Sequence, residues 1–321
     1  MADYTRLARL SLGGILGFSL VRLGAAERAR KGVLASSCVS CVSFHNPHPL
    51  LFERCIRWLR DGGFTFISED RVIAISRGQA HAAPGAVWIS FDDGWRGNLS
   101  LLPVIERHEV PVTIFLTTGA VEPPGVFWWT CVYDHRSELP HPLRSSVLRI
   151  WDLPETERRE IVEPVLRRHQ MEYARQALTI DEVRHLARSP LVSLGSHSVG
   201  HPSLPRCDSA QLDDELYASK KSIEGWTGRP VKTFAYPRNE FDGREKDALR
   251  RNGYELAVTV EERAYCYAED DAYYVPRVVV GEDSFFSANV CKMVGAWRPY
   301  VDWARRIKPP APGRRRSTGL L

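Results

Sequence analysis

The sequence predicts an α/β fold in which parallel strands form a barrel and the helices pack outside it. From residue 38 onward, short apolar runs of strand length alternate with segments of helical periodicity, and this alternation is typical of parallel sheets. No stretch of linker composition interrupts the series, which favours one barrel over two separate domains. The 321-residue chain has 44% hydrophobic residues, enough for a full core, and shows no internal repeat.

A strand is expected where a mostly apolar run has strand length, and a helix where apolar residues recur with helical spacing. The expected strands are residues 38–45, 64–68, 86–91, 111–118, 192–197, 232–236, 256–260 and 273–280. The expected helices are residues 51–60, 98–108, 180–187, 209–226 and 244–251.

Three segments stand outside this alternation and set the expected domain organisation. Residues 1–37 are expected to form an N-terminal amphipathic helix region, and residues 38–290 the barrel. Residues 119–178 form an insert in the barrel, with a charged helix near residues 155–174, and an insert this long is expected to cap one barrel mouth. Residues 291–321 are a C-terminal extension whose basic, proline-containing tail we expect to be disordered.

The composition limits the classes of binding partner and the cell compartments that we expect. The net charge of +4 is too small to predict nucleic-acid binding, so we expect no nucleic-acid partner. Seven cysteines in a chain of this length argue against a disulfide framework. Cys38 and Cys41 are expected to be buried structural thiols, with a redox or metal-binding pair as the alternative. This cysteine usage favours a reducing compartment.

The N-terminal segment leaves two localisations open. Residues 10–21 are uncharged and resemble the apolar part of an export signal, but Asp3 precedes them and Arg22 follows directly. The stretch is too short to span a bilayer, which takes about 20 residues. We therefore expect a cytoplasmic protein with a peripheral contact at the inner membrane face, and the alternative is export.

Two polar motifs follow predicted strands and together suggest a metal site. Asp92 and Asp93 come directly after an apolar run, and two buried neighbouring carboxylates are costly unless a cation compensates them. An Asp that caps the following turn is the simpler explanation, but it accounts for one carboxylate only. His197 and His201 can converge on one ion if their loop turns like a helix, although either could be a capping or core group. An Asp/His/His set suits a catalytic zinc with an open position for water.

A third polar segment, T-F-A-Y-P-R at residues 233–238, also ends a predicted strand. By itself it fits an ordinary strand end broken by proline. All three motifs nevertheless lie at the carboxyl ends of predicted strands, where barrel enzymes place their active sites. The three motifs therefore predict an active site on this rim of the barrel.

These motifs resemble those of the polysaccharide deacetylases, the NodB-homology or carbohydrate esterase family 4 group. S-F-D-D-G at 90–94 and H-S-V-G-H at 197–201 are similar to the first two family motifs, and F-A-Y-P at 234–237 is similar to the third. The resemblance covers residues 38–281. It implies a distorted (β/α) barrel of seven or eight strands and hydrolysis of N- or O-acetyl groups on sugars with a divalent metal, most often zinc.

The resemblance also assigns roles to individual residues. Asp93, His197 and His201 would hold the metal, and Asp92 would act as the general base. The backbone N–H of Arg238 would help to bind the oxyanion of the reaction.

Two positions depart from the family pattern. Ala235 stands near the place of the arginine that orients the base, so we expect Arg277 to take this role, with Arg238 as the alternative. The family's late acid motif is missing, because no histidine follows residue 201. In poly-N-acetylglucosamine deacetylases this histidine lies on the first strand, and S-F-H-N at 43–46 resembles that site. We therefore expect His45 to be the general acid, with the nearby His48 as the alternative.

Flat aromatic faces suit a sugar ring, and several aromatic residues lie near the motifs. We expect one of Trp95, Trp128 and Trp129 in the substrate groove, although such residues are as often core anchors. Tyr236 and Pro237 of the third motif are also assigned to the groove. The remaining histidines have no partner in the sequence and are expected to be structural or on the surface: His81, His108, His135, His141, His169 and His185.

The sequence thus predicts a metal-dependent hydrolase that removes an acetyl group from an N-acetylated glycan or lipid-linked sugar. One alternative is a carbohydrate-binding pseudoenzyme without catalysis, although the intact metal and base positions argue against it. Another is a related metal amidase that acts on a non-sugar acetamide.

Overall fold

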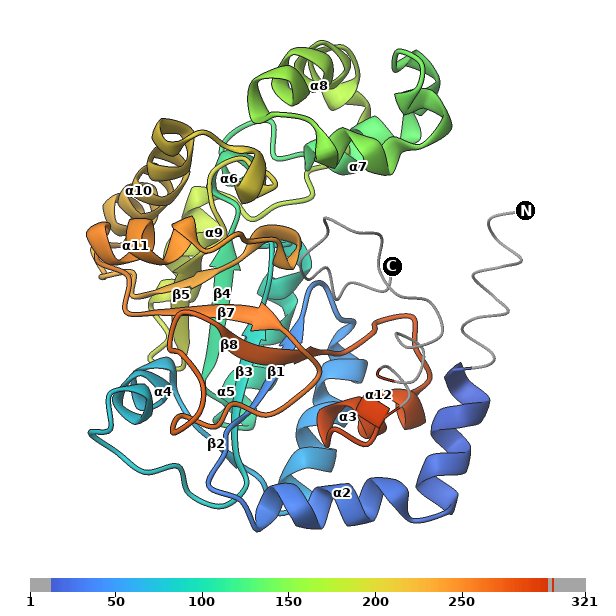
Figure 1. The fold of residues 1–321 in the computed structure, drawn as a ribbon, viewed down its shortest axis with the longest axis vertical. Helices are drawn as coiled ribbons and strands as arrows, with labels where there is room; N and C mark the ends of the chain where they lie inside the picture. The colour runs from blue at the N-terminus through green and yellow to red at the C-terminus, as the bar shows by residue number, and fades with distance from the viewer. Residues whose placement is uncertain (1–12, 300–301, 303–321) are drawn as a thin grey trace.

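Eight parallel strands form the centre of this computed structural model, which describes residues 13–299 and residue 302 (Figure 1). Strand β1 pairs with both β3 and β8, and this double pairing closes seven strands into a barrel, while the short β2 pairs with β3 beside it. The predicted barrel fold is therefore confirmed. The strands are β1 (Ser40–Phe44), β2 (Thr65–Phe66), β3 (Ala86–Phe91), β4 (Val112–Leu116), β5 (Val192–Ser196), β6 (Thr233–Ala235), β7 (Leu256–Val260) and β8 (Val275–Val279).

Successive side chains of each strand point alternately into the barrel and toward the surrounding helices. In β3, Val87, Ile89 and Phe91 belong to the core between strands and helices, whereas Trp88 belongs to the core inside the barrel. The same alternation directs Asp92, two residues after Ser90, toward the barrel interior. Because side chains alternate along a strand, Asp92 rather than Asp93 faces the barrel interior.

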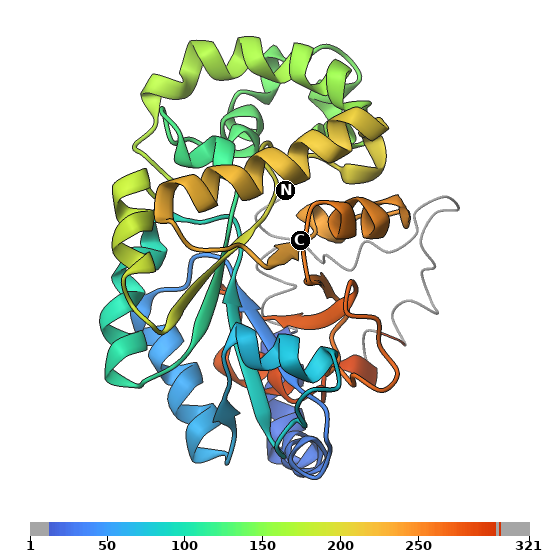
Figure 2. The same cartoon turned by 90° about the vertical axis from the view of Figure 1, so that its left-hand side faces the viewer.

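The helices cover the outside of the barrel, as the strand–helix alternation predicts (Figure 2). Two helices, α4 and α12, were not among the expected ones, and the expected helix at 98–108 is divided into a 3₁₀ segment and a short α-helix. The helices of the barrel are α2 (Ala25–Leu34), α3 (Pro49–Asp61), α4 (Glu69–Ser76), η1 (Arg96–Leu101), α5 (Leu102–Arg107), α9 (Ile180–Ala187), η6 (Leu204–Arg206), α10 (Ser209–Thr227), η7 (Pro237–Asn239), α11 (Arg244–Arg251) and α12 (Phe286–Met293).

The insert between β4 and β5 lies beyond the carboxyl ends of these strands, at one end of the molecule. It has a hydrophobic core of its own, to which Trp128, Ile150 and Val162 contribute. Its elements are α6 (Thr118–Val121), α7 (Trp128–Asp134), η2 (Arg136–Glu138), η3 (Leu143–Ser145), η4 (Val147–Asp152), α8 (Glu155–His169) and η5 (Gln170–Glu172).

The N-terminal region packs on α12 at the flank of the barrel. Residues 13–22 are helical, and the Cβ atom of any other residue at Gly17 would lie 2.6 Å from the backbone nitrogen of Ala288. The glycine is thus required for this close approach. No helix among residues 13–299 is long and apolar enough to cross a membrane. The first residues of the stretch that resembles an export signal, and the basic C-terminal tail, lie outside the described residues.

The cysteine prediction is wrong in one respect. Cys38 forms a disulfide with Cys266, which is 228 residues away in the sequence, next to a backbone bridge between Val39 and Tyr265. The barrel brings the start of β1 beside the segment that follows β7, so local spacing gave no sign of the partner. Cys41 is a buried free thiol as predicted, and burial raises its pKa to about 12.

Candidate active site

Arg277 holds Asp92 inside the barrel. Its Nη1 and Nη2 atoms donate to the two carboxylate oxygens of Asp92 at 2.7 and 2.8 Å, and Nη1 also donates to the Ser90 hydroxyl at 2.9 Å. The side chains of Arg277 and Asp92 are only 1% and 6% exposed. The structure thus brings together the expected base and the arginine that the sequence placed beside it, and the pair compensates two buried charges with two-pronged geometry.

Asp93 turns away from the direction of β3 because the backbone becomes left-handed there. The φ angles of Asp93 and Gly94 are 70° and 78°, and a Cβ atom at residue 94 would lie 2.7 Å from Cδ2 of Leu116. Glycine is therefore required at position 94. The indole Nε1 of Trp95 donates to Oδ2 of Asp93 at 2.9 Å, which leaves Oδ1 directed at the histidine loop.

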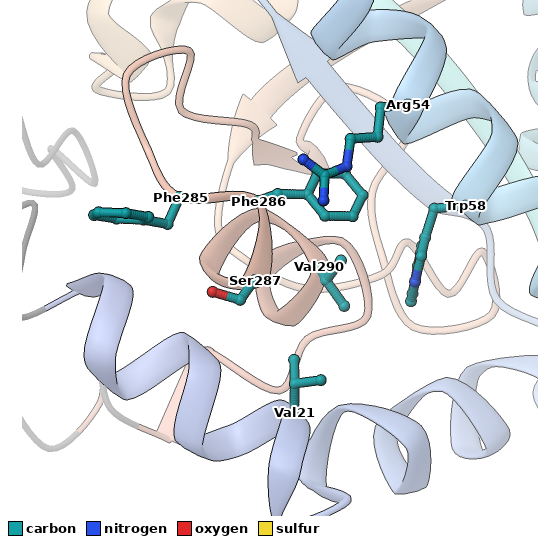
Figure 3. A pocket seen from close by; sticks show the side chains of 7 residues that line it. All are labelled: Val21, Arg54, Trp58, Phe285, Phe286, Ser287 and Val290. Carbon is teal, nitrogen blue, oxygen red and sulfur yellow. The ribbon is translucent and has the colours of Figure 1, made fainter.

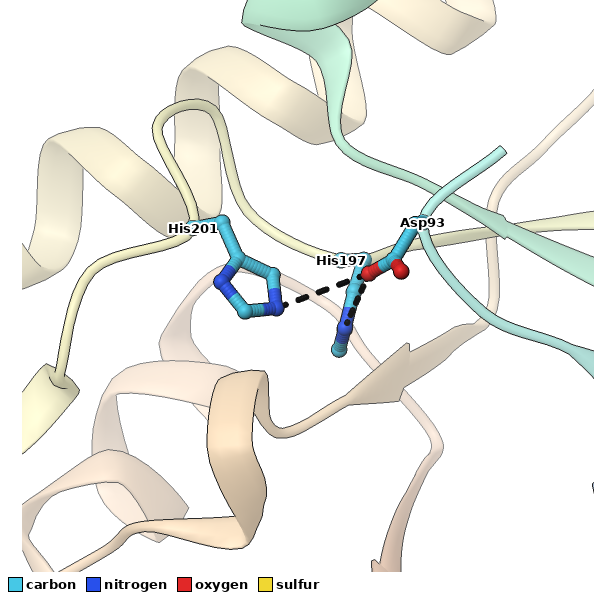
Figure 4. A group of neighbouring side chains, drawn as sticks. All are labelled: Asp93, His197 and His201. Atoms are coloured by element: carbon cyan, nitrogen blue, oxygen red, sulfur yellow. Dashed lines mark ion pairs between the residues drawn. The ribbon is translucent and has the colours of Figure 1, made fainter. Parts of the chain in front are cut away.

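His197 and His201 converge on the free oxygen of Asp93 (Figure 4). Their Nε2 atoms lie 3.4 and 3.5 Å from Oδ1 of Asp93. The loop turns sharply because Ser198 and His201 have φ angles of 67° and 51°, and the hydroxyl of Ser198 accepts the backbone N–H of His201 at 3.0 Å. The Nδ1 atom of His197 donates to the carbonyl of Ala235 at 2.8 Å, which leaves its Nε2 as the acceptor.

The Asp93–His197–His201 cluster fits a tetrahedral metal ion. Two ligands that each lie 2.0–2.2 Å from zinc at the tetrahedral angle are about 3.4 Å apart, close to both Asp93–histidine separations. All three residues are buried, and their donor atoms lie within 4.8 Å of one another. The hydrogen bonds to His197 and Asp93 orient these side chains as outer-shell partners do in metal sites, whereas Nδ1 of His201 has no partner among the described residues.

Electrostatics favour an ionised Asp93 and a neutral His201, as a metal site needs, whereas the pKa of His197, which burial lowers, is raised overall by Asp93 and Asp92. Burial raises the pKa of Asp93, but its contact with His197 and the nearby histidine charges outweigh this effect, so the net pKa lies far below its ordinary value. Burial also raises the pKa of Asp92, and the charge of Arg277 reverses this effect. Burial and the charge of His197 lower the pKa of His201 to about 3, so its imidazole is neutral.

His45 lies on the same rim, directly after β1, and is half-buried. Its charge contributes to the lowered pKa of both Asp92 and Asp93. Its backbone is fixed on both sides, because its N–H donates to Glu282 at 3.0 Å and its carbonyl accepts from Asn98 at 2.8 Å. The alternative, His48, is exposed and caps α3 instead. The geometry therefore favours His45 over His48 as a group that reaches the site.

At the third motif, the backbone conformation shapes the active site more than the side chains do. Arg238 is left-handed, with a φ of 56°, and its guanidinium lies over the ring of Trp151 at 4.4 Å, so it does not hold the base. Tyr236 is 3% exposed, and its hydroxyl donates to the carbonyl of Tyr273 at 3.0 Å. Pro237 is buried at the start of η7. Tyr236 and Pro237 are thus buried beside the barrel rim, and their assignment to the substrate groove stays a prediction.

The expected tryptophans have different positions. Trp128 takes the expected alternative of a core anchor, because it is 8% exposed and its indole donates to the carbonyl of Gly200 at 3.0 Å. Trp129 is partly exposed and its ring lies 4.5 Å from that of His201. Trp95 is also partly exposed and contacts Asp93. Trp95 and Trp129 thus each contact one residue of the Asp93–His197–His201 cluster.

Sequence reasoning missed Trp151. Its ring lies 5.6 Å from that of His201 and 4.3 Å from that of Trp128, so it forms part of the aromatic wall beside the cluster. Trp151 lies in a 3₁₀ segment of the insert, far from any strand end, and no local pattern marks it.

Sequence reasoning also missed a buried network that supports the histidine loop. Glu215 of α10 accepts the backbone N–H groups of Val199 and Gly200, each at 2.8 Å. Its other oxygen accepts from Arg159 of α8 at 2.8 Å, and Arg159 also donates to Glu155 at 2.7 Å. Glu215 therefore fixes the loop between the two histidines and connects it to the insert.

Comparisons with known proteins agree with this site. A sequence model of the polysaccharide deacetylase family matches residues 80–257, more than half of the chain. The chain is 21% identical over 235 residues to the poly-β-1,6-N-acetyl-D-glucosamine N-deacetylase of Staphylococcus aureus (strain MRSA252), covering 73% of this chain and 67% of that protein. It is 20% identical to YxkH of Bacillus subtilis (strain 168) over 65% of this chain, and it spans 57% of the length of YxkH.

Solved structures share the fold. The deacetylase PplD of Streptococcus pyogenes, determined in complex with acetate, superposes with a TM-score of 0.58 at 17% identity, over 80% of this chain and 98% of that one. The IcaB structure from Ammonifex degensii gives a TM-score of 0.56 at 15% identity, again over 80% and 98%. At these identities the likeness establishes the barrel architecture.

Proposed function

Because this chain belongs to the polysaccharide deacetylase family, we propose that it removes an acetyl group from an N-acetylated sugar in a polysaccharide, oligosaccharide or glycolipid. The observation that carries the proposal is the Asp93–His197–His201 cluster beside the carboxylate of Asp92. Hydrolysis of an amide needs a polarised carbonyl, a base for water and an acid for the leaving amine. The rim of the barrel offers a residue for each of these tasks.

Each residue has a defined part in the proposed reaction. A divalent cation, of which zinc suits the donors best, would be held by Asp93, His197 and His201 and would polarise the acetyl carbonyl and acidify water. Asp92 takes a proton as water adds to the carbonyl carbon, and Arg277 keeps its carboxylate ionised and fixed in position.

The remaining steps fall to the other side of the rim. The backbone N–H of Arg238 donates to the developing oxyanion. His45 then gives a proton to the sugar nitrogen as the carbon–nitrogen bond breaks, so that acetate and a free amine leave. The partial burial of His45 and its fixed backbone support this role.

The name of the Staphylococcus aureus relative guides the choice of the first substrate. That protein is named for the deacetylation of poly-β-1,6-N-acetyl-D-glucosamine. We therefore propose oligomers of N-acetylglucosamine as the first substrates to test, beside acetylated polyamines as the representatives of non-sugar acetamides. The exposed faces of Trp95 and Trp129 are proposed to contact the sugar.

Metal content and acetate release test this proposal together. We expect the wild-type protein to release acetate from the oligomers after reconstitution with zinc, and His197→Ala to bind one zinc ion fewer per chain and to lose activity. Asp92→Asn should keep the zinc content and lose activity, whereas His185→Ala, at an exposed histidine, should change neither. Acetate release by Asp92→Asn at the wild-type rate would refute the proposed base. If His197→Ala loses zinc but the zinc-loaded wild type releases acetate from no substrate class, the result would favour a pseudoenzyme.

We also propose that the N-terminal helix contacts a membrane surface. Large apolar side chains are exposed on and beside this helix, at 65% for Ile15, 59% for Phe18 and 56% for Phe285. Phe285 also borders a pocket of about 390 Å³ between this helix, α3 and α12, which is lined by Val21, Arg54, Trp58, Phe285, Phe286, Ser287 and Val290 (Figure 3). Apolar side chains flanked by arginine suit a surface with anionic lipid headgroups.

Vesicle binding tests this contact. We expect the full chain to co-sediment with vesicles that contain anionic lipid, and Phe18→Glu to reduce binding by about tenfold, since burial of one Phe contributes about 1.5–3 kcal/mol. Tyr217→Glu is the matched control, because Tyr217 is similarly exposed, at 55%, but lies on α10. Equal binding of the two variants would refute the contact.

The compartment is a separate proposal. The Cys38–Cys266 disulfide favours the exported alternative over the cytoplasmic prediction, because disulfides persist in oxidising compartments. We expect the native protein to resist thiol alkylation at Cys38 unless it is first reduced. Complete alkylation of Cys38 in protein taken directly from cells would support the cytoplasmic prediction instead.

A further inference from the structure

The pocket between the N-terminal helix, α3 and α12 has the size and the lining of a site for an apolar ligand (Figure 3). Its volume of about 390 Å³ lies within the range of about 300–1,000 Å³ that is typical of small-molecule sites. The residues that line it are aromatic or aliphatic except for Ser287 and Arg54. Two of its apolar side chains remain exposed, Val21 at 41% and Phe285 at 56%. A hydrocarbon chain in the pocket would cover them.

One face of α3 leads from this pocket to the rim of the barrel. Leu50, Arg54 and Trp58 are spaced by four residues and therefore share one face of the helix. Arg54 and Trp58 line the pocket. Leu50 lies in the first turn, next to the rim, and is 71% exposed. Eight residues of helix span about 12 Å, so one extended hydrocarbon chain can reach from the rim into the pocket.

The loop before α12 connects the pocket to the rim a second time. Oε1 of Glu282 accepts the backbone N–H groups of His45 and Asn46, which follow β1 at the rim. Phe285, which borders the pocket, follows Glu282 by three residues, so their Cα atoms are at most about 11 Å apart. The pocket and the expected general acid therefore lie on the same side of the barrel.

The arginines at this pocket have no acidic partner. Arg54 lines the pocket and Arg22 follows the lining residue Val21, and neither forms an ion pair with a carboxylate among the described residues. The guanidinium carbon of Arg54 lies 3.9 Å from the ring centre of Phe286. A guanidinium that stacks on a ring keeps its N–H groups available for a phosphate group. The pocket therefore suits an anionic group that is joined to a hydrocarbon chain.

We propose that this pocket binds the hydrocarbon chain of a lipid-linked substrate, in which a phosphate group joins the chain to the N-acetylated sugar. The chain lies along α3 with its end beside Trp58, the phosphate pairs with the exposed Arg54, and the sugar reaches the rim. This inference rests on the proposed function, because it names the class of acetylated sugar that the site accepts.

Two substrates that differ only in the chain test this inference. They are N-acetylglucosaminyl phosphate esterified with a dodecyl chain or with a methyl group, each assayed as a monomer below its critical micelle concentration. With the zinc-loaded wild type, we expect kcat/KM for acetate release to be about 100-fold higher for the dodecyl ester, because the pocket removes its apolar surface from water.

Variants then assign this preference to the pocket. Ser287→Trp fills the pocket and should bring the ratio of the two kcat/KM values close to one. Ser222→Trp, at a similarly half-buried serine on α10, is the matched control and should keep the wild-type ratio. Arg54→Gln should weaken the preference for the dodecyl phosphate ester over an uncharged dodecyl glycoside about tenfold. Since each ratio is measured within one preparation, a partly unfolded variant cannot imitate these results.

A binding measurement separates this inference from the proposed function. Glucosyl phosphate dodecyl ester, which carries no acetyl group, is titrated into the protein in a calorimeter, and we expect it to bind the wild type and to bind Ser287→Trp about tenfold more weakly. Such binding without acetate release from any substrate would refute the proposed function and leave the pocket as a lipid-phosphate site. Acetate release with equal kcat/KM from the two esters would overturn the inference and leave the proposed function.

Two further results would also overturn the inference. One is a wild-type ratio that persists in Ser287→Trp, because the chain would then bind elsewhere. The other is a dodecyl preference that appears only in the presence of anionic phospholipid vesicles, because the apolar surface would then contact the bilayer instead of holding the substrate.

Discussion

The contact between Arg277 and Asp92 can be tested by removing one charge and then both. Arg277→Met keeps much of the side-chain length but leaves the buried carboxylate of Asp92 without its cation. The structure shows what is lost: two charge-assisted hydrogen bonds of 2.7 and 2.8 Å between side chains that are 1% and 6% exposed. Removal of one partner from such a buried pair costs about 3–5 kcal/mol of unfolding free energy.

The double variant Arg277→Met/Asp92→Asn removes both buried charges. We expect it to recover most of the lost stability, to within about 1–2 kcal/mol of the wild type, because replacement of a whole buried ion pair is far less costly than its breakage. Deacetylation should stay absent in the double variant, because the carboxylate that serves as the base is gone. The second substitution should therefore restore stability without restoring activity.

Urea denaturation followed by circular dichroism gives the unfolding free energies, and the chelator EDTA should be present so that no bound cation compensates Asp92. Acetate release after zinc reconstitution gives the activities. Arg277→Lys is the control, because it keeps the charge but loses the two-pronged geometry. A cost below about 1 kcal/mol for Arg277→Met, or a double variant no more stable than the single one, would refute the reasoning.

Three further predictions concern other parts of the chain. Burial raises the pKa of Glu69 to about 7 from 4.5, so the folded chain keeps a proton that the unfolded chain releases, and stability should fall by about 3 kcal/mol as pH rises from about 4.5 to 7. Glu69→Gln should remove this fall in urea denaturation series, and an unchanged pH slope would contradict the assignment. Trp95→Phe should weaken zinc binding about 10–100-fold in competition titrations, because Asp93 loses its indole donor; unchanged affinity would count against this support. Cys38→Ser should cost about 2–5 kcal/mol in thermal or urea unfolding, and no loss would mean that the bond with Cys266 constrains the unfolded chain little.

Much of the fold follows from sequence patterns that are local. The apolar runs predicted all eight strands, because a parallel strand buried on both faces is apolar along its length. The helices α9 and α11 begin and end where their periodicity predicts. The helices α4 and α12 were missed although they are as long as α9 and α11; in α4 the apolar residues 72–75 are consecutive and show no helical spacing.

The core of the site was predictable for the same reason. Asp92, Asp93, His197 and His201 directly follow strands, and the closing of a parallel barrel brings all strand ends to one rim. The remaining contacts are long-range and have no local pattern. Arg277 lies 185 residues from Asp92, and the choice of this arginine came from a gap in the family pattern.

The contacts that sequence reasoning missed depend mainly on how the insert folds. Trp128 and Trp151 are adjacent in space because the insert folds around its own core. The short 3₁₀ segments of the insert have no regular hydrophobic period from which this contact could be predicted. The pairing of His135 with His169 depends on the same folding. The partner of Cys38 was hidden because it lies beyond β7, near the other end of the barrel.

The buried network of Glu155, Arg159 and Glu215 has a consequence for protein engineering. The insert cannot be exchanged as a free-standing module, because Arg159 belongs to the insert and Glu215 to the barrel. A chimaera with a foreign insert would leave Glu215 buried without its cation, and this same carboxylate positions the loop between His197 and His201. A transplant that aims to change substrate preference must therefore carry an arginine at this junction, or it will disturb the metal ligands as well.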